Sequence, residues 1–157
     1  MNTRDAPETI VIDAHRIAPK LWVGSAPGPE HGQLFDVIVL CAIEYQPSLL
    51  AQRVVHAGFD DTITPTRDEL RLARDTAALV NMHRAAGKRV LVSCLQGRNR
   101  SALVASLALV LQGMSPSVAI QQVRLHRRHP EGKMILANTA FVKFIHHVGM
   151  QTIRPRR

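Results

Sequence analysis

The sequence predicts one α/β domain with a central, mostly parallel sheet of about four or five strands flanked by helices. Its 157 residues are the usual length of a single domain. Short apolar runs fill the first half of the chain, whereas helical patterns with capping signals fill most of the second half. The chain has no internal repeat and no long linker. We therefore expect a single domain over residues 1–157, with a core at about 9–148 and short flexible tails.

Five apolar runs are expected as strands, separated by turn residues that include Pro27, Gly28, Pro29 and Pro47. The runs are "TIVID" at 9–13, "KLWVG" at 20–24, "DVIVLC" at 36–41, "RVVHA" at 53–57 and "KRVLVSC" at 88–94. The last run is continuous and rich in valine, which is the pattern of a strand covered on both faces.

Helices are expected mainly after residue 65. Thr66 and Glu69 form an S/T-x-x-E capping box, which predicts a helix that runs to about Ala86 and ends at Gly87. Further helices are expected at 98–112, at 116–126 behind Ser115, and from a cap at Asn138 to about Val148.

Composition excludes several classes of protein. Hydrophobic residues make up 46% of the chain, and two cysteines are too few for a secreted disulfide scaffold. The N-terminal segment mixes charges of both signs and does not resemble a signal peptide. The longest apolar run, 102–111, is too short to span a bilayer. We expect a cytoplasmic, monomeric protein without a membrane span.

The charge is unevenly distributed along the chain. Residues 1–78 carry 7 Lys/Arg against 11 Asp/Glu, whereas residues 79–157 carry 13 against 1. Such a field attracts phosphorylated ligands, although a solvated basic surface would have the same composition. Aromatic residues make up only 4% of the chain, so recognition of single strands by base stacking is poorly supported. No stable complex with nucleic acid is expected.

The segment "LVSCLQGRNRSALV" at 91–104 contains the candidate site. Cys94 lies where the predicted strand ends, and Ser101 lies in the first turn of the next helix. The amides between them can form a nest that binds an anion, helped by the helix dipole. Gly97 permits the required turn, and the planar guanidinium of Arg100 can bind two phosphate oxygens. A positive environment of this kind favours a cysteine thiolate.

The segment "CLQGRNRS" matches the C-x5-R-[ST] motif of cysteine-dependent phosphatases. The chain resembles the dual-specificity branch of the protein tyrosine phosphatase superfamily over about residues 15–147. The other similar segments are "LWVGSAP", "FDDT", "GKRVLVSC", "GMSPSVAIQQVRLHRR" and "ANTAFVKFI".

The resemblance implies a phosphatase that forms a phosphocysteine at Cys94 and needs no cofactor. Arg100 and the loop would bind the phosphoryl group, and Ser101 would improve the thiolate as a leaving group. An upstream aspartate would act as general acid, and we favour Asp61 over the adjacent Asp60. The expected phosphate-binding residues are Leu95, Gln96, Gly97, Arg98, Asn99 and Arg100. The eight histidines lack ligand spacing, so no metal site is expected.

The resemblance favours phosphotyrosine and phosphoserine or phosphothreonine proteins as substrates, because no phosphotyrosine-recognition loop of the longer enzymes is evident. Arg98 suggests an alternative substrate with several phosphates, such as an inositol phosphate, a phosphoinositide or an RNA 5′ end. A solvated Arg98 explains the same residue equally well. Ser93 stands where the superfamily usually has histidine, which implies weaker activity and leaves a phosphate-binding pseudophosphatase as a further alternative.

Cys41 has two interpretations. It ends the predicted strand at 36–41, and strand ends in a parallel sheet gather beside the loop that carries the site. The resemblance implies that it can form a reversible disulfide with Cys94. The simpler interpretation is a small buried apolar residue.

Overall fold

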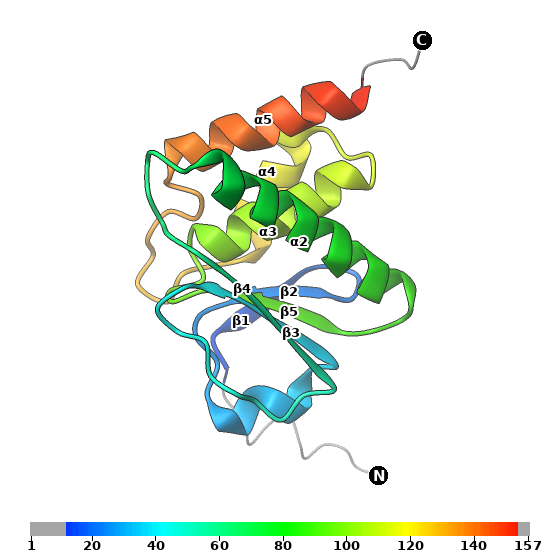
Figure 1. Ribbon diagram of the computed structural model, residues 1–157, viewed down its shortest axis with the longest axis vertical. Coiled ribbons are helices and arrows are strands. Elements are labelled where there is room, and N and C mark those ends of the chain that lie inside the picture. Colours follow the sequence, from blue (N-terminus) through cyan, green and yellow to red (C-terminus); the bar gives the residue numbers. More distant parts are fainter. Residues whose placement is uncertain (1–11, 154–157) are drawn as a thin grey trace.

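The computed structural model describes residues 12–153, and their strands and α-helices follow one another in the predicted order, with a 3-10 helix that was not predicted (Figure 1). The strands are β1 (Ala14–Ala18), β2 (Leu21–Gly24), β3 (Val37–Ala42), β4 (Arg53–Phe59) and β5 (Val90–Ser93). The helices are the 3-10 helix η1 (Pro29–Leu34) and the α-helices α2 (Arg67–Ala85), α3 (Arg100–Leu111), α4 (Pro116–His126) and α5 (Thr139–Ile153). The tails expected at the two ends lie mostly outside the described residues.

The five strands form one sheet in the order β1-β2-β5-β3-β4. Only β1 and β2 pair antiparallel; β2 with β5, β5 with β3 and β3 with β4 are parallel. The predicted α/β class and mostly parallel sheet are thus confirmed. The sheet places the carboxyl ends of β5, β3 and β4 side by side, which is the usual position of a ligand site in such sheets.

The first strand lies further along the chain than expected. The predicted run at 9–13 falls largely outside the described residues, and β1 begins at Ala14. Its position follows from pairing with β2 across a tight turn at Lys20, which has a left-handed φ of 64°. Register with a neighbouring strand therefore decides this element more strongly than its apolar content does.

The four α-helices lie on one face of the sheet, and η1 lies on the other (Figure 1). The larger hydrophobic cluster fills the space between the sheet and the helices. The buried residues of a smaller cluster are Phe35, Ile38, Leu40 and Leu91. Helices therefore flank the sheet unequally. The connection from β3 to β4 is a loop at 43–52 rather than a helix, so it adds no helical cover to the second face.

The helix α3 is the centre of the helical layer. Every residue from Arg100 to Val110 is buried, because the helix packs on the sheet and on α2, α4 and α5. A helix that is apolar all round has no face suited to water. Its burial brings its first two residues, Arg100 and Ser101, into the interior beside the end of β5.

The starts of α2 and α5 agree with their predicted caps, whereas α3 begins at Arg100 rather than at residue 98, and Ser115 precedes α4 without a side-chain cap hydrogen bond. The Thr66 hydroxyl accepts a hydrogen bond from the Glu69 amide at 3.1 Å, and the Glu69 carboxylate accepts one from the Thr66 amide at 3.0 Å. Asn138 caps α5 by accepting from the amides of Ala140 and Phe141.

The last helix extends beyond its predicted end near Val148. α5 continues through Gly149 to Ile153. The glycine has a packing role, because a Cβ at this position would lie 2.1 Å from the Pro116 ring. The glycine allows α5 to pack closely against the start of α4. No helix among residues 12–153 has the length and apolar character needed to cross a bilayer.

Candidate active site

The loop between β5 and α3 spans residues 94–99, as the strand-to-helix pattern predicts. Gly97 has a φ of 63°, and a Cβ there would lie 2.4 Å from the carbonyl carbon of Gly24 and 2.5 Å from Arg127 Nη2. A side chain would therefore meet both a strained backbone and a clash. Glycine is required here for close packing as well as for the turn.

The sulfur of Cys94 faces a small cavity. Cys94 is 4% exposed, and its Sγ lies 3.1 Å from the hydroxyl oxygen of Ser101. The cavity measures about 100 Å³ and is lined by Asp61, Cys94, Leu95, Gln96, Arg98, Asn99 and Arg100. All of these residues except Asp61 belong to the loop or are the first residue of α3. Of the predicted catalytic and phosphate-binding residues, only Gly97 and Ser101 are not among the lining residues, and both are buried beside them. The alternative acid Asp60 and the second cysteine, Cys41, do not line the cavity.

The loop offers free donors around this cavity. Within the described part of the chain, none of the backbone amides from Leu95 to Arg100 donates a hydrogen bond to a carbonyl. Backbone amides need a hydrogen-bond partner, so a row of amides without a backbone partner indicates a place for a ligand or solvent. Their position at the start of α3 adds the positive end of the helix dipole. The arrangement suits an anion.

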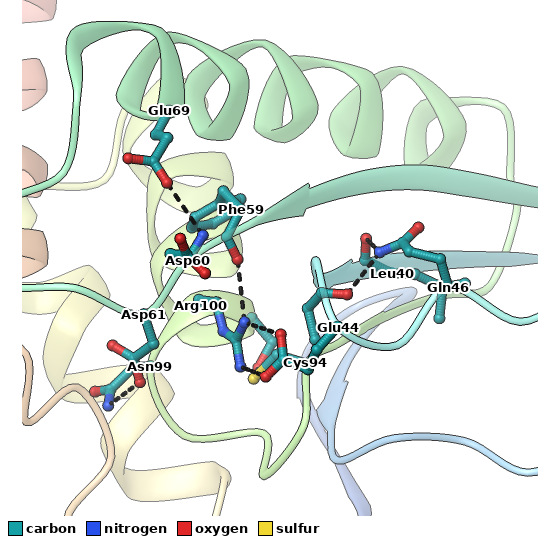
Figure 2. Close-up of polar contacts among 12 residues, drawn as sticks. Leu40, Glu44, Gln46, Phe59, Asp60, Asp61, Glu69, Cys94, Asn99 and Arg100 are labelled. Atoms are coloured by element: carbon teal, nitrogen blue, oxygen red, sulfur yellow. Dashed lines mark hydrogen bonds and ion pairs between the residues drawn. The ribbon is translucent and has the colours of Figure 1, made fainter.

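Arg100 is fixed by the ends of two neighbouring strands (Figure 2). Its Nη1 and Nη2 donate to the two carboxylate oxygens of Glu44 at 2.6 and 2.8 Å, and Nη1 also donates to the Phe59 carbonyl at 3.0 Å. Its Nε is buried and has no hydrogen-bond partner among the described residues. An unpaired buried donor costs about 1–3 kcal/mol, so its position at the cavity is suited to an anionic partner.

Glu44 was not foreseen from the sequence. Hydrogen bonds from Arg100 lower the pKa of Glu44 to about 2, although burial alone would raise it. Burial alone would lower the pKa of Arg100, but the Glu44 carboxylate and the charges of Cys94 and Asp61 raise it. Glu44 lies two residues after β3 and directly after the apolar run that ends at Ile43, and an acidic residue in that position is the signal that could have found it.

Asp61 and Asp60 point to different surroundings (Figure 2). The Asp61 carboxylate lines the cavity and accepts hydrogen bonds from the side-chain amides of Asn99 and Asn138, both at 2.9 Å. Asp60 does not line the cavity, and its backbone amide donates to Glu69 at 3.1 Å. Of the two candidates, the structure brings only Asp61 beside Cys94.

Asn99 and Asn138 connect the loop, the Asp61 segment and α5. The backbone N–H of Asn138 donates to the side-chain oxygen of Asn99 at 3.0 Å. The side-chain amide of Asn138 also donates to the Thr62 carbonyl at 2.8 Å. The Asn138 side chain thus has two tasks, because its oxygen caps α5 while its amide holds the Asp61 segment. The sequence predicted the cap, and the contact with Asp61 is a finding of the structure.

Arg127 supports the loop from behind. It is fully buried, and it donates to the carbonyls of Gln96 at 2.8 Å and Gly97 at 2.9 Å. It also donates to the Asp13 carboxylate at 2.6 and 3.0 Å, and its Nη1 lies 3.3 Å from His15 Nδ1. Burial alone would raise the pKa of Asp13, but hydrogen bonds from Arg127 and Ser25 lower it. No motif in the sequence points to this ion pair, so it is a finding of the structure.

Arg98, Ser93 and Cys41 surround this centre. Arg98 lines the cavity, and its Nε donates to the Met134 carbonyl at 2.8 Å. The Ser93 hydroxyl donates to the Val39 carbonyl of β3 at 3.1 Å. Cys41 is a fully buried free thiol, and burial raises its pKa well above the usual value, with a further contribution from the charge of Cys94.

Comparisons with known proteins agree with this geometry. No protein-family model matches the chain, and no curated protein matches it. Among solved structures, a point variant of human DUSP28 has 25% sequence identity and a TM-score of 0.72, covering 88% of this chain and 95% of its own. A mouse putative dual specificity phosphatase complexed with zinc tungstate has 22% identity and a TM-score of 0.75, covering 99% of this chain and all of its own.

These structural neighbours are dual-specificity and tyrosine phosphatases, and they indicate the cysteine-based superfamily of such enzymes. The resemblance noted at "CLQGRNRS" is thereby confirmed at the level of the superfamily. PTPMT1 in complex with PI(5)P is a further neighbour, with 18% identity and a TM-score of 0.67 over 89% of this chain and 99% of that one. At these identities the neighbours indicate a cysteine-based phosphatase and leave its substrate class open.

The described residues contain no group of three or more His, Cys, Asp or Glu side chains arranged to hold a metal ion. The donors at the site are amides, a guanidinium and a thiol, and this set suits an oxyanion.

Proposed function

We propose that this chain hydrolyses phosphomonoesters through a phosphocysteine at Cys94, acting on phosphotyrosine and on phosphoserine or phosphothreonine proteins. The observation that carries the proposal is the cavity itself. It brings the Cys94 sulfur, the Asp61 carboxylate and the guanidinium of Arg100 around one space of about 100 Å³.

In the first step the Cys94 thiolate attacks phosphorus, and the bond from phosphorus to the ester oxygen breaks. Asp61 gives its proton to the departing oxygen, so the alcohol or phenol leaves neutral. The loop amides and the Nε of Arg100 stabilise the negative charge on the other phosphoryl oxygens. Because Glu44 and Phe59 already hold the guanidinium, little reorganisation is needed during the reaction.

In the second step water attacks the phosphocysteine and releases inorganic phosphate. The Asp61 carboxylate takes the proton from this water, and the bond from sulfur to phosphorus breaks. The Ser101 hydroxyl, 3.1 Å from the sulfur, donates a hydrogen bond to the thiolate as it forms. This bond makes Cys94 a better leaving group.

The size of the cavity supports a broad choice of phosphorylated side chain. Pockets that enclose a whole ligand measure about 300–1,000 Å³, whereas this one holds a phosphoryl group and little more. The side chain that carries the phosphate then stays at the surface, where an aromatic or an aliphatic group can be accommodated. Asp61 is an exposed residue at the rim, which also fits a shallow site.

One observation favours substrates with a second phosphate. Arg98 lines the cavity and its Nε donates to the Met134 carbonyl, which leaves its other guanidinium nitrogens as candidate donors to a second phosphate group. PTPMT1, solved in complex with PI(5)P, shares the fold. Inositol phosphates and phosphoinositides are therefore the second candidate class.

Hydrolysis of para-nitrophenyl phosphate in the presence of a chelator tests the proposal. We expect turnover by the unmodified chain and none by Cys94→Ser, with a phosphoenzyme trapped by rapid acid quench only in the former. Turnover that survives Cys94→Ser would contradict the proposal. Phosphate binding without turnover would instead support a pseudophosphatase, for which Ser93 is the motivating departure from the usual histidine.

A further inference from the structure

A second, much larger hollow lies between α2 and α5. It measures about 910 Å³ and begins at Ile63, two residues after Asp61, from where it continues along the two helices. We call it the α2/α5 groove. It exists because α2 and α5 both pack on α3 and hardly touch each other. One hydrogen bond crosses it, from Arg74 to Gln151 at 2.8 Å.

The walls of the α2/α5 groove are positively charged. Arg67, Arg71 and Arg74 lie on one face of α2, because residues three and four apart are neighbours on a helix. Lys143 and His147 stand on the facing side of α5. None of the described lining residues carries a carboxylate, and none of these five side chains is in an ion pair within residues 12–153.

The floor of the groove is apolar. Ile63 is 76% exposed, and Leu70 and Phe144 contribute half-buried side chains from the two helices. Apolar surface flanked by three arginines of α2 and by Lys143 of α5 complements a chain segment that alternates acidic and apolar side chains. A flat membrane surface would reach the cations and leave this concave floor uncovered.

The groove is continuous with the candidate active site. The segment Asp61–Ile63 passes from the cavity to the groove, and Asn138 holds that segment through Asp61 and the Thr62 carbonyl. Thr139 and Ala140, which follow Asn138, line the same end of the groove. A segment bound here would lie within a few residues of a phosphorylated side chain in the cavity.

We propose that the α2/α5 groove binds an acidic, partly apolar segment next to the phosphorylated residue of a protein substrate. The proposal rests on the proposed phosphatase function and adds to it a class of preferred protein substrate. Binding energy in the groove is the same before and during the reaction, so the preference is expected in KM rather than kcat.

Two phosphopeptides test the substrate preference. They share one phosphorylated residue, and their flanks alternate Glu with Leu in the first and Gln with Leu in the second. We expect the acidic peptide to have a KM about tenfold lower at low salt, which is the size of two exposed ion pairs together. The difference should shrink as salt rises.

Charge reversal in the groove should remove this preference. The double variant Arg71→Glu with Lys143→Glu should bring the two KM values together while para-nitrophenyl phosphate turnover stays unchanged. The matched control is Arg16→Glu with Arg53→Glu, which reverses two exposed cations outside the groove and changes the net charge equally. The control should keep the preference.

A binding measurement separates this proposal from the activity. The unphosphorylated acidic peptide, followed by fluorescence anisotropy, should bind the unmodified chain and not the groove variant. Equal KM values for the two peptides, or equal losses in variant and control, would overturn the proposal. So would groove-dependent sedimentation with vesicles of equal parts phosphatidylcholine and phosphatidylserine in the absence of peptide binding. If no phosphoester is hydrolysed, the proposed function fails, and the anisotropy still tests the groove.

Discussion

At the scale of single residues, the site depends on which side chains share the cavity with Cys94. Adjacent positions in the chain have different environments, because Asp61 reaches the cavity while Asp60 contacts α2 through its backbone amide. A carboxylate has about four lone-pair positions. The hydrogen bonds from the side-chain amides of Asn99 and Asn138 use two of these positions and orient Asp61. The remaining positions leave its oxygens able to carry a proton toward a substrate.

The assignment of the general acid is tested by two separate substitutions. With an alkyl phosphate, whose leaving group needs a proton, Asp61→Asn should lower kcat by about 10²–10⁴-fold. It should also remove the limb of the pH–rate profile that falls as pH rises. Asp60→Asn is the control and should leave both unchanged. The opposite result would assign the proton transfer to Asp60.

Glu44 should act as a positioning residue through Arg100. Glu44→Gln keeps the shape and removes the charge, so the guanidinium loses half of its two-pronged anchor. We expect kcat/KM to fall by roughly 10–100-fold, the range expected when a reacting group is misplaced by about 1 Å. Binding of vanadate should weaken in parallel. An unchanged kcat/KM would show that Phe59 alone holds Arg100.

The same carboxylate makes a pH-dependent contribution to stability. The pKa of Glu44 is lowered from 4.5 to about 2 in the folded chain, so its contribution is fully present above pH 4.5 and is lost as pH falls toward 2. Asp36 is a matched control at the opposite end of the strands. Hydrogen bonds from Arg89 lower the pKa of Asp36 to about 2 as well. Asp36→Asn should change acid unfolding in the same pH range without changing activity.

At the scale of elements, parallel pairing explains why the two cysteines are neighbours. In the β3–β5 register, Leu40 pairs with Ser93, so Cys41 and Cys94 follow directly on adjacent strands. Neighbouring strands lie about 4.7–4.9 Å apart, which is within the Cα separations of roughly 4.4–6.8 Å found in disulfides. The arrangement permits a bridge without a large backbone movement.

We expect mild peroxide to produce a reversible Cys41–Cys94 disulfide. Peroxide oxidises the Cys94 thiolate to a sulfenic acid, and the Cys41 thiol then condenses with it and releases water. Mass spectrometry should detect the crosslinked peptide, and Cys41→Ser should instead lead to irreversible oxidation of Cys94. Sulfonic acid at Cys94 with no crosslink in the unmodified chain would leave Cys41 as a buried core residue.

At the scale of the whole molecule, the ion pair of Arg127 and Asp13 connects the start of the described chain to the end of α4. Asp13 precedes β1 and Arg127 follows α4. Arg127 bonds to both Asp13 and the Gln96 carbonyl, so it joins these two segments to the loop at 94–99. Removing one partner of a buried pair leaves the other uncompensated, which costs about 3–5 kcal/mol. The lower end of this range applies here because Asp13 is partly exposed.

Arg127→Met should therefore destabilise the chain by about 3 kcal/mol and also reduce phosphate binding, because the loop loses two donors to its carbonyls. Denaturant unfolding gives the stability, and competition with inorganic phosphate gives the binding. Asp13→Asn is the control, since it weakens the pair but leaves Arg127 free to hold the loop. Equal losses of phosphate binding in both variants would show that the pair acts through global stability alone.

The sequence alone determined the features that depend on neighbours along the chain. The capping box at Thr66, the apolar run into Cys94, the turn at Gly97 and the return of Arg100 are local patterns, and each has a direct physical reason. The α/β class and the mostly parallel sheet followed from the same patterns.

Only the tertiary structure decided which distant residues complete the site. Glu44, Asn138 and Arg127 lie 56, 38 and 27 residues away from Arg100 along the chain, and sheet order and helix packing bring them together. The same packing separates α2 from α5 and creates the basic groove. No periodicity or motif encodes such contacts, because they depend on strand register and on the crossing of helices over α3.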